Sequence, residues 1–138
     1  MRRILQVAGL LVAAGLSACA GSGGQSAIPE LQITGLEFQN RTQRFISATR
    51  LLVPATGGFV SCGAMGPGAF CASTFPERAY SGNPVEVTWS STGQIHSTGL
   101  LQVLPSESVI EAGRARVRVV ILGDGLAAIE LLPEPGSP

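Results

Sequence analysis

The stretch that decides the fold is RARVRVVIL, from Arg114 to Leu122. Apolar residues recur in it at every second position, and arginine fills the first positions between them. Because successive side chains of a β-strand point to opposite faces, this period predicts a strand with one buried and one charged face. The residues expected to face inward are Ala115, Val117, Val119 and Ile121, and those facing outward are Arg114, Arg116 and Arg118.

A second clear strand precedes it, at Val85 to Ser90. The side chains expected inside are those of Val85, Val87 and Trp89. Ser91 to Gln94 is interpreted as a four-residue hairpin loop leading into a returning strand, Ile95 to Leu104. Further strands are expected at Leu31–Phe38, Arg44–Val53, Phe59–Ser61, Ala72–Phe75 and Leu126–Leu132. In the first of these the apolar phase changes at Gly35, which predicts a β-bulge there.

The spacing of these segments predicts the fold class. About seven short strands, separated by glycine-, proline- and asparagine-rich turns, are typical of an all-β protein, and no convincing helix is found. We expect an antiparallel β-sandwich of immunoglobulin or fibronectin-III type over residues 31–132, with a small β-barrel as the alternative. The cysteine and tryptophan spacing of antibody domains is absent. Residues 133–138 carry three prolines and are expected to be a disordered tail.

The N-terminal segment carries a separate signal. Arg2 and Arg3 precede an apolar run of about thirteen residues, too short for a bilayer core that needs roughly 20 helical residues. The run closes on Leu16-Ser17-Ala18-Cys19. This pattern resembles the lipobox of bacterial lipoproteins, and the resemblance covers the first nineteen residues only. An ordinary secretory signal with a chance cysteine is the alternative.

The resemblance implies a chemistry and a location. Residues 1–18 would be the signal peptide, and Cys19 would receive a diacylglycerol thioether before the chain is cut in front of it. Two or more acyl chains anchor a protein stably in a membrane, whereas one binds only weakly. Ala20 stands where aspartate is the usual inner-membrane retention signal, which favours the outer membrane and a periplasm-facing domain. Residues 19–30 are rich in glycine, serine and alanine and would be a flexible tether.

Charge and cysteine usage limit the possible functions. Without Arg2 and Arg3 the chain has seven arginines and nine acids, which argues against a nucleic-acid partner. Apart from Cys19 there are two cysteines, Cys62 and Cys71, and an oxidising compartment predicts a disulfide between them. Two cysteines and one histidine make an incomplete set for structural zinc, so no metal and no cofactor are expected.

His96 is the only candidate for general acid–base chemistry. It is the single histidine, it precedes Ser97, and the single aspartate is Asp124. A hydrolase would need these groups in register, and no nucleophile-elbow motif surrounds a serine. A histidine at the start of a hairpin strand, with no catalytic role, is the simpler interpretation.

Arg114, Arg116 and Arg118 form a basic stripe along one face of their strand. Such a stripe could bind an anionic partner, or its arginines could pair across strands with Glu86 or Glu130. The chain is therefore interpreted as a non-catalytic binding or structural module, attached to the membrane through lipid on Cys19 and meeting an unknown envelope protein or glycan. The alternatives are a small envelope hydrolase that uses His96, and an inhibitor or chaperone that adds a strand to its sheet edge.

Overall fold

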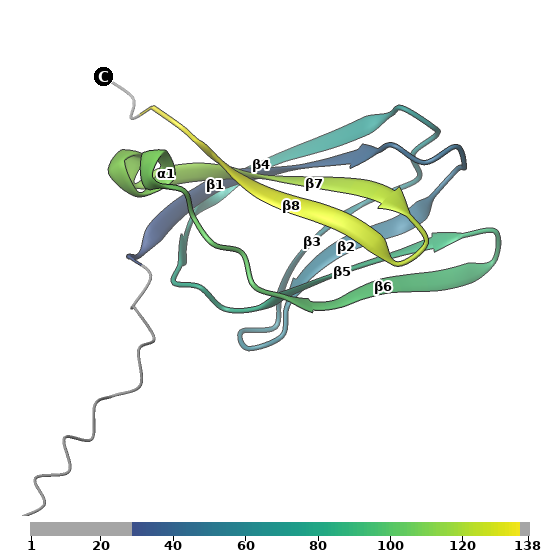
Figure 1. The fold of residues 1–138 in the computed structure, drawn as a ribbon, viewed down its shortest axis with the longest axis horizontal. Helices are drawn as coiled ribbons and strands as arrows, with labels where there is room; N and C mark the ends of the chain where they lie inside the picture. The colour runs from purple at the N-terminus through teal and green to yellow at the C-terminus, as the bar shows by residue number, and fades with distance from the viewer. Residues whose placement is uncertain (1–28, 136–138) are drawn as a thin grey trace, which may run out of the picture.

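The computed structural model describes residues 29–135, except for the side chains of Phe75 and Pro76. Eight strands and one short helix lie within this range (Figure 1). The strands are β1 (Leu31–Asn40), β2 (Ser47–Val53), β3 (Gly58–Cys62), β4 (Phe70–Tyr80), β5 (Val85–Ser91), β6 (Gln94–Leu101), β7 (Arg114–Gly123) and β8 (Leu126–Pro133), and the helix is α1 (Glu107–Ala112). The segment expected to be a signal peptide, residues 1–18, and Cys19 fall outside the described residues.

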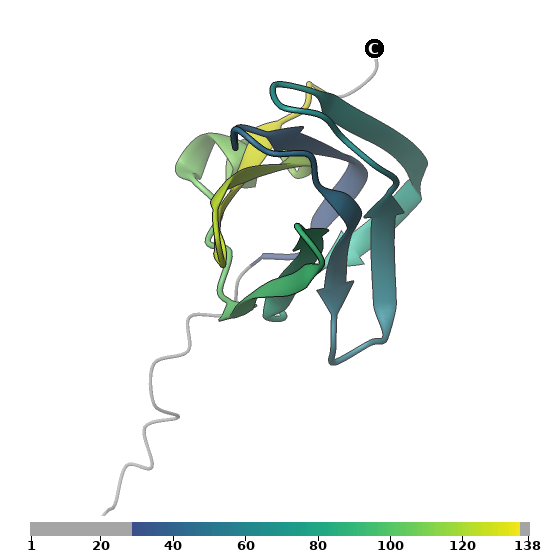
Figure 2. The same ribbon diagram turned by 90° about the vertical axis from the view of Figure 1, so that its right-hand side faces the viewer.

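The strands form two four-stranded sheets. One has the order β4-β1-β7-β8 and the other β3-β2-β5-β6. The sheets lie face to face and do not close into a barrel (Figure 2), so the all-β sandwich is confirmed. All pairs within the sheets are antiparallel except β1 with β7, which run parallel in a register that joins Phe38 to Val119. The expectation of a purely antiparallel sandwich is corrected at this one pair.

The core lies between the inner faces of the two sheets. Trp89 of β5 and Phe38 of β1 are its largest side chains, and both are buried. The inward phase expected for β7 is confirmed, because Ala115, Val119 and Ile121 are buried as well. A sheet that packs every second side chain against another sheet buries apolar surface and keeps its backbone hydrogen bonds. For this reason a period of two in the apolar residues predicts a β-sandwich.

The bulge expected at Gly35 is present. The register of β1 shifts between Ile33 and Gly35 against both of its neighbours, β4 and β7. A Cβ at Gly35 would lie 2.9 Å from the backbone oxygen of Ser73, closer than side-chain carbons approach. Glycine is therefore required by the close approach of β4, and the extra residue changes the phase of the apolar pattern along β1.

Two segments expected to be turns or loops form regular structure. β4 continues through Pro76 to Tyr80, where a turn was expected. It is an edge strand, so one side of its backbone has no neighbouring strand, and a proline that lacks an N–H on that side breaks no hydrogen bond of the sheet. Helix α1 occupies part of the loop expected before Arg114. It begins after Ser106 and ends at Gly113, whose φ of 67° is left-handed, a common way for a helix to stop.

Several boundaries also differ from the sequence interpretation, among them the β5–β6 loop and the end of β8. The β5–β6 loop has two residues rather than four, Thr92 and Gly93, with φ of 52° and 76°, because a tight turn with two positive φ values matches the twist of a hairpin. β8 extends to Pro133, which pairs with Ala115, so the expected tail begins too early by at least that residue. Within residues 29–135 no helix is long and apolar enough to span a membrane.

Candidate functional site

Cys62 and Cys71 are joined by a disulfide, as predicted. Cys62 ends β3 and Cys71 lies near the start of β4, and these two strands are edge strands of different sheets. The bond, with a Cα–Cα distance of 6.3 Å, therefore ties the two sheets together along one open side of the sandwich. The intervening loop is further held by a bridge between Ile46 and Met65, whose backbone groups exchange hydrogen bonds of 2.8 and 3.0 Å.

The arginine stripe lies on the outer face of the β4-β1-β7-β8 sheet, and two of its members are paired. Arg114 Nη2 lies 2.6 Å from Glu77 Oε1 on β4. Arg118 lies between two acids, 3.2 Å from Glu130 and 3.7 Å from Glu37. The cross-strand interpretation is confirmed for Glu130. It is wrong for Glu86, which lies on the other sheet.

Arg116 completes the stripe as an exposed residue opposite Leu132. Since both neighbouring arginines on this face already meet carboxylates, the stripe offers little uncompensated positive charge. Exposed ion pairs of this kind contribute about 0–1 kcal/mol each to stability. The stripe is therefore a weak candidate for an anion-binding surface.

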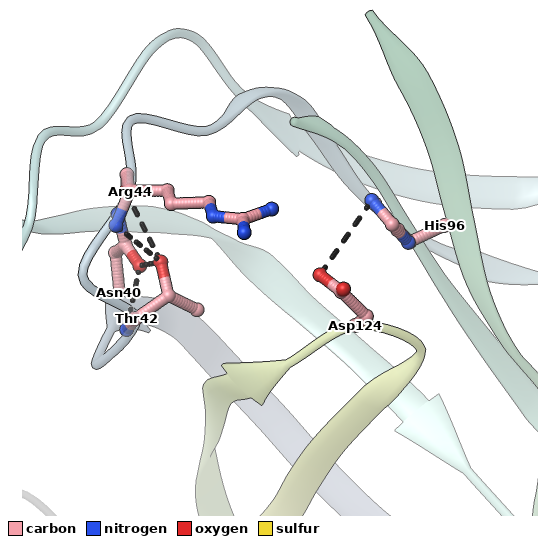
Figure 3. A network of polar contacts seen from close by, with 5 residues as sticks. All are labelled: Asn40, Thr42, Arg44, His96 and Asp124. Carbon is pink, nitrogen blue, oxygen red and sulfur yellow. Dashed lines mark hydrogen bonds and ion pairs between the residues drawn. The ribbon is translucent and has the colours of Figure 1, made fainter. Parts of the chain in front are cut away.

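His96 points inward from β6 and stacks on Trp89, with ring centroids 5.8 Å apart and the planes 27° from parallel. Its Nε2 lies 3.9 Å from Oδ1 of Asp124, which sits in the turn between β7 and β8. Figure 3 shows these two side chains facing each other, with Arg44 reaching toward them. A separation of 3.9 Å is too long for a hydrogen bond, so His96 and Asp124 are neighbours without a direct bond.

Ser97 does not join this pair. It follows His96 on a strand, so its side chain lies on the opposite face of the sheet, where its hydroxyl donates to Glu86 Oε1 at 2.6 Å. The structure brings the histidine and the aspartate together and turns the adjacent serine away. The arrangement needed for Ser97 to act as a nucleophile activated by His96 is not formed.

Asn40 is a buried polar residue whose role the sequence interpretation missed. Its amide nitrogen donates to the carbonyls of Arg44 at 2.8 Å, Gly66 at 3.0 Å and Met65 at 3.1 Å, while its oxygen accepts from the backbone N–H of Thr42 at 3.0 Å. Asn40 therefore fastens the β1–β2 loop to the disulfide loop. The Asn-Arg-Thr sequence could have suggested the bond to Thr42, since asparagine often accepts from the residue two positions on, but not the contacts to distant carbonyls.

An apolar cavity of about 140 Å³ lies between the sheets, and it was not expected from the sequence. Both inner faces contribute aliphatic walls, among them Ile33, Val117 and Ile129 from one sheet and Leu51, Val53 and Val85 from the other. Among the described residues that line it there is no carboxylate, imidazole or thiol. Such a lining suits an apolar guest and offers no general acid or base of ordinary pKa near neutrality.

The cavity lies toward the end of the β3 and β4 edges that is opposite to the disulfide. Gly58 to Val60 of β3 and Arg78 to Tyr80 of β4 line it, whereas Cys62 and Cys71 lie at the other ends of these strands. Nη1 of Arg78 comes within 3.9 Å of the position that a Cβ would take at Gly58. The Arg78 side chain thus reaches from the edge of one sheet to the edge of the other, beside the cavity.

Tyr80 forms a polar border of the cavity. Its hydroxyl lies 3.2 Å from the carbonyl oxygens of both Asn83 and Val103 and can donate its proton to either. Burial raises the pKa of the Tyr80 phenol above its ordinary value. In the part of the chain that the structure describes, no three His, Cys, Asp or Glu residues are grouped so as to hold a metal ion.

Comparison with known proteins adds little to this description. No protein-family model and no curated protein matches the chain. Among solved structures, the chain is similar to the NMR structure of the protein from Eubacterium rectale, with 13% sequence identity and a TM-score of 0.44 over 75% of this chain and 89% of that chain. A likeness at this level assigns neither a family nor a function.

Proposed function

We propose that this protein is a lipoprotein of the bacterial cell envelope, anchored through lipid on Cys19 to the outer membrane and facing the periplasm. Its β-sandwich acts as a non-catalytic binding module. The location rests on the sequence Leu16-Ser17-Ala18-Cys19 behind a short apolar run. The disulfide between Cys62 and Cys71 agrees with this location, because such bonds persist in the periplasm and are rare in the cytosol.

The observation that carries the binding role is the apolar cavity between the sheets. Small-molecule sites in proteins are concave and mostly apolar, with a few polar groups at the border, and this cavity has that make-up. A hydrolytic role for His96 receives less support, since Ser97 lies on the other face of the sheet and is bonded to Glu86. The binding interpretation therefore rests on a cavity with the lining of a ligand site, and the hydrolase interpretation lacks a placed nucleophile.

The anchor is tested by metabolic labelling with a fatty acid in a bacterial host. The wild-type chain should incorporate label and should sediment with the outer membrane. Cys19→Ser should remain an unprocessed precursor without label, because the hydroxyl of serine cannot form the thioether. The double variant Cys62→Ser, Cys71→Ser serves as the matched control, since it removes two other thiols and should be labelled normally. Normal labelling of Cys19→Ser would show that the lipid is carried by another residue and would overturn the assignment of Cys19.

A further inference from the structure

We propose that the cavity between the sheets binds the hydrocarbon chain of a fatty acid of about six to eight carbons, with the carboxylate held beside Arg78. This inference rests on the proposed binding role of the domain and names the ligand of the same cavity. It does not depend on the lipid anchor, because every residue that it uses lies within the described β-sandwich.

The size of the cavity sets the length of the chain. Its volume of about 140 Å³ is close to the roughly 150 Å³ of an engineered apolar cavity that stays dry and takes up benzene, a molecule of six carbons. A chain of about six carbons therefore fills a space of this size. One or two further carbons reach the border, where the head group meets the solvent.

The walls select a hydrocarbon over a polar guest. Ile33, Val117 and Ile129 on one side and Leu51, Val53 and Val85 on the other present only methyl and methylene groups. A polar group buried among them would lose its hydrogen bonds to water and gain none, which is costly. An alkyl chain has no hydrogen bonds to lose, and each methylene group that it buries makes the free energy of binding more favourable.

The border of the cavity selects an anionic head group. Arg78 is the charged residue among the described residues that line the cavity, and it is accompanied there by the polar side chains of Thr56 and Asn83. Guanidinium groups bind carboxylates through paired N–H donors. A guanidinium carries five N–H donors, so Arg78 can bind a carboxylate alongside its other contacts.

The placement of the disulfide explains why the site can admit a chain from the side. The bond between Cys62 and Cys71 ties the β3 and β4 edges at one end, and the cavity lies toward the other end of the same two edges. Among the described residues no covalent link joins the edges at Gly58 and Arg78, so these ends of the two strands can part without any change at the disulfide-bonded end. A linear ligand enters lengthwise between the two edges.

The test is calorimetric titration of sodium octanoate into the full chain as purified from cells. A lipidated chain is measured in lipid nanodiscs, and the heat measured with empty nanodiscs is subtracted. A chain without lipid is measured in buffer. We expect saturable binding at one site. Val60→Phe, which places a ring at the cavity, should weaken the affinity at least tenfold. Val120→Phe is the matched control, since it makes the same exchange on the outer face of β7, and it should leave the affinity unchanged.

A comparison of ligands tests the head group without any variant. Octanoate should bind more tightly than 1-octanol, and 1-octanol more tightly than octylammonium. Arg78→Gln should weaken octanoate binding severalfold and leave 1-octanol unaffected. Absence of saturable binding, equal affinity for octanoate and octylammonium, or full affinity in a folded Val60→Phe variant would each overturn the inference.

The two proposals fail in distinguishable ways. Octanoate binding by a chain that takes up no lipid label would remove the anchor and leave the cavity site in place. Normal labelling of Cys19 together with no octanoate binding would keep the anchor and remove the fatty-acid ligand.

Discussion

Tyr80 shows how a single polar group is accommodated beside an apolar cavity. Its ring packs with the core while its hydroxyl reaches two backbone carbonyls, of Asn83 and Val103, that would otherwise lack this partner. A buried carbonyl is costly to leave unpaired. Ionisation of the phenol would remove the donated proton and place a charge near aliphatic side chains, which is the physical reason that burial raises the pKa of Tyr80.

Tyr80 should make the stability of the domain fall at alkaline pH. Because the folded-state pKa is raised, the stabilisation is complete below the unfolded pKa of about 10 and is lost as the pH rises through the folded value. Among residues 29–135 no other side chain titrates in this window, since these residues include one tyrosine and no lysine, and Cys62 and Cys71 are bonded. Denaturant unfolding at several pH values, together with the ultraviolet absorbance of tyrosinate, measures the effect.

Tyr80→Phe is the control for this prediction. At neutral pH it should lower the free energy of unfolding by about 1 kcal/mol through loss of the hydrogen bond. Above pH 10 it should abolish the Tyr80 contribution to the pH dependence. A variant that kept the full alkaline decline would show that the decline has another origin.

Asn40 marks the limit of sequence reasoning at the residue scale. Its bond to Thr42 depends only on nearby residues and is the part of its role that the sequence could suggest. Its bonds to Met65 and Gly66 depend on where a loop far along the chain is placed by the disulfide. The same holds for the cavity, whose walls come from both sheets and whose border is set by Arg78 and Tyr80.

At the scale of elements, strands were predictable where one face is buried, and less so elsewhere. β5 and β7 alternate because one face of each meets the other sheet, and both were expected from their sequences. β4 has less of its surface in the core and contains Pro76, so its pattern resembles a turn until its place at a sheet edge is known. Helix α1 has a single buried residue, Val109, which is too little for a helical period to be recognised.

The disulfide should stabilise the sandwich by restricting the unfolded chain. In the chain-entropy model, a loop of this length contributes about 2.7 kcal/mol. Cys62→Ala with Cys71→Ala should therefore lower the free energy of unfolding by about that amount, as measured by urea denaturation. The wild-type chain under reducing conditions should show a similar loss, and the double variant should not respond to the reductant. A variant as stable as the oxidised protein would argue against this contribution.

At the scale of the whole molecule, the architecture was predictable and the strand order was not. Alternation reports that a strand has one buried face, but it carries no information about which strand lies beside it. The parallel pairing of β1 with β7 joins the beginning and the end of the domain, so that Gln32 lies beside Arg114. A purely antiparallel arrangement was expected because neighbouring strands in sequence usually pair, and here that rule holds for the hairpins alone.

This long-range pairing should make folding slow. Bringing distant residues into contact costs chain entropy before the contacts stabilise the folded state. Proteins with many such contacts fold in milliseconds to seconds. Trp89 is the single tryptophan and is buried in the core, so stopped-flow fluorescence reports the formation of the core directly. The disulfide is kept intact in the experiment. Complete refolding within microseconds would contradict the prediction.

The position of β1 has a mechanical consequence. The chain enters the domain at Leu31, and β1 lies between β4 and β7 with hydrogen bonds on both sides. If the protein is anchored through Cys19, any pull from the membrane acts along the length of this inner strand. Such a load shears two ladders at once and must break many hydrogen bonds together, whereas a pull across an edge strand would open them one at a time. As an inner strand, β1 is thus better placed to resist such a load than an edge strand would be.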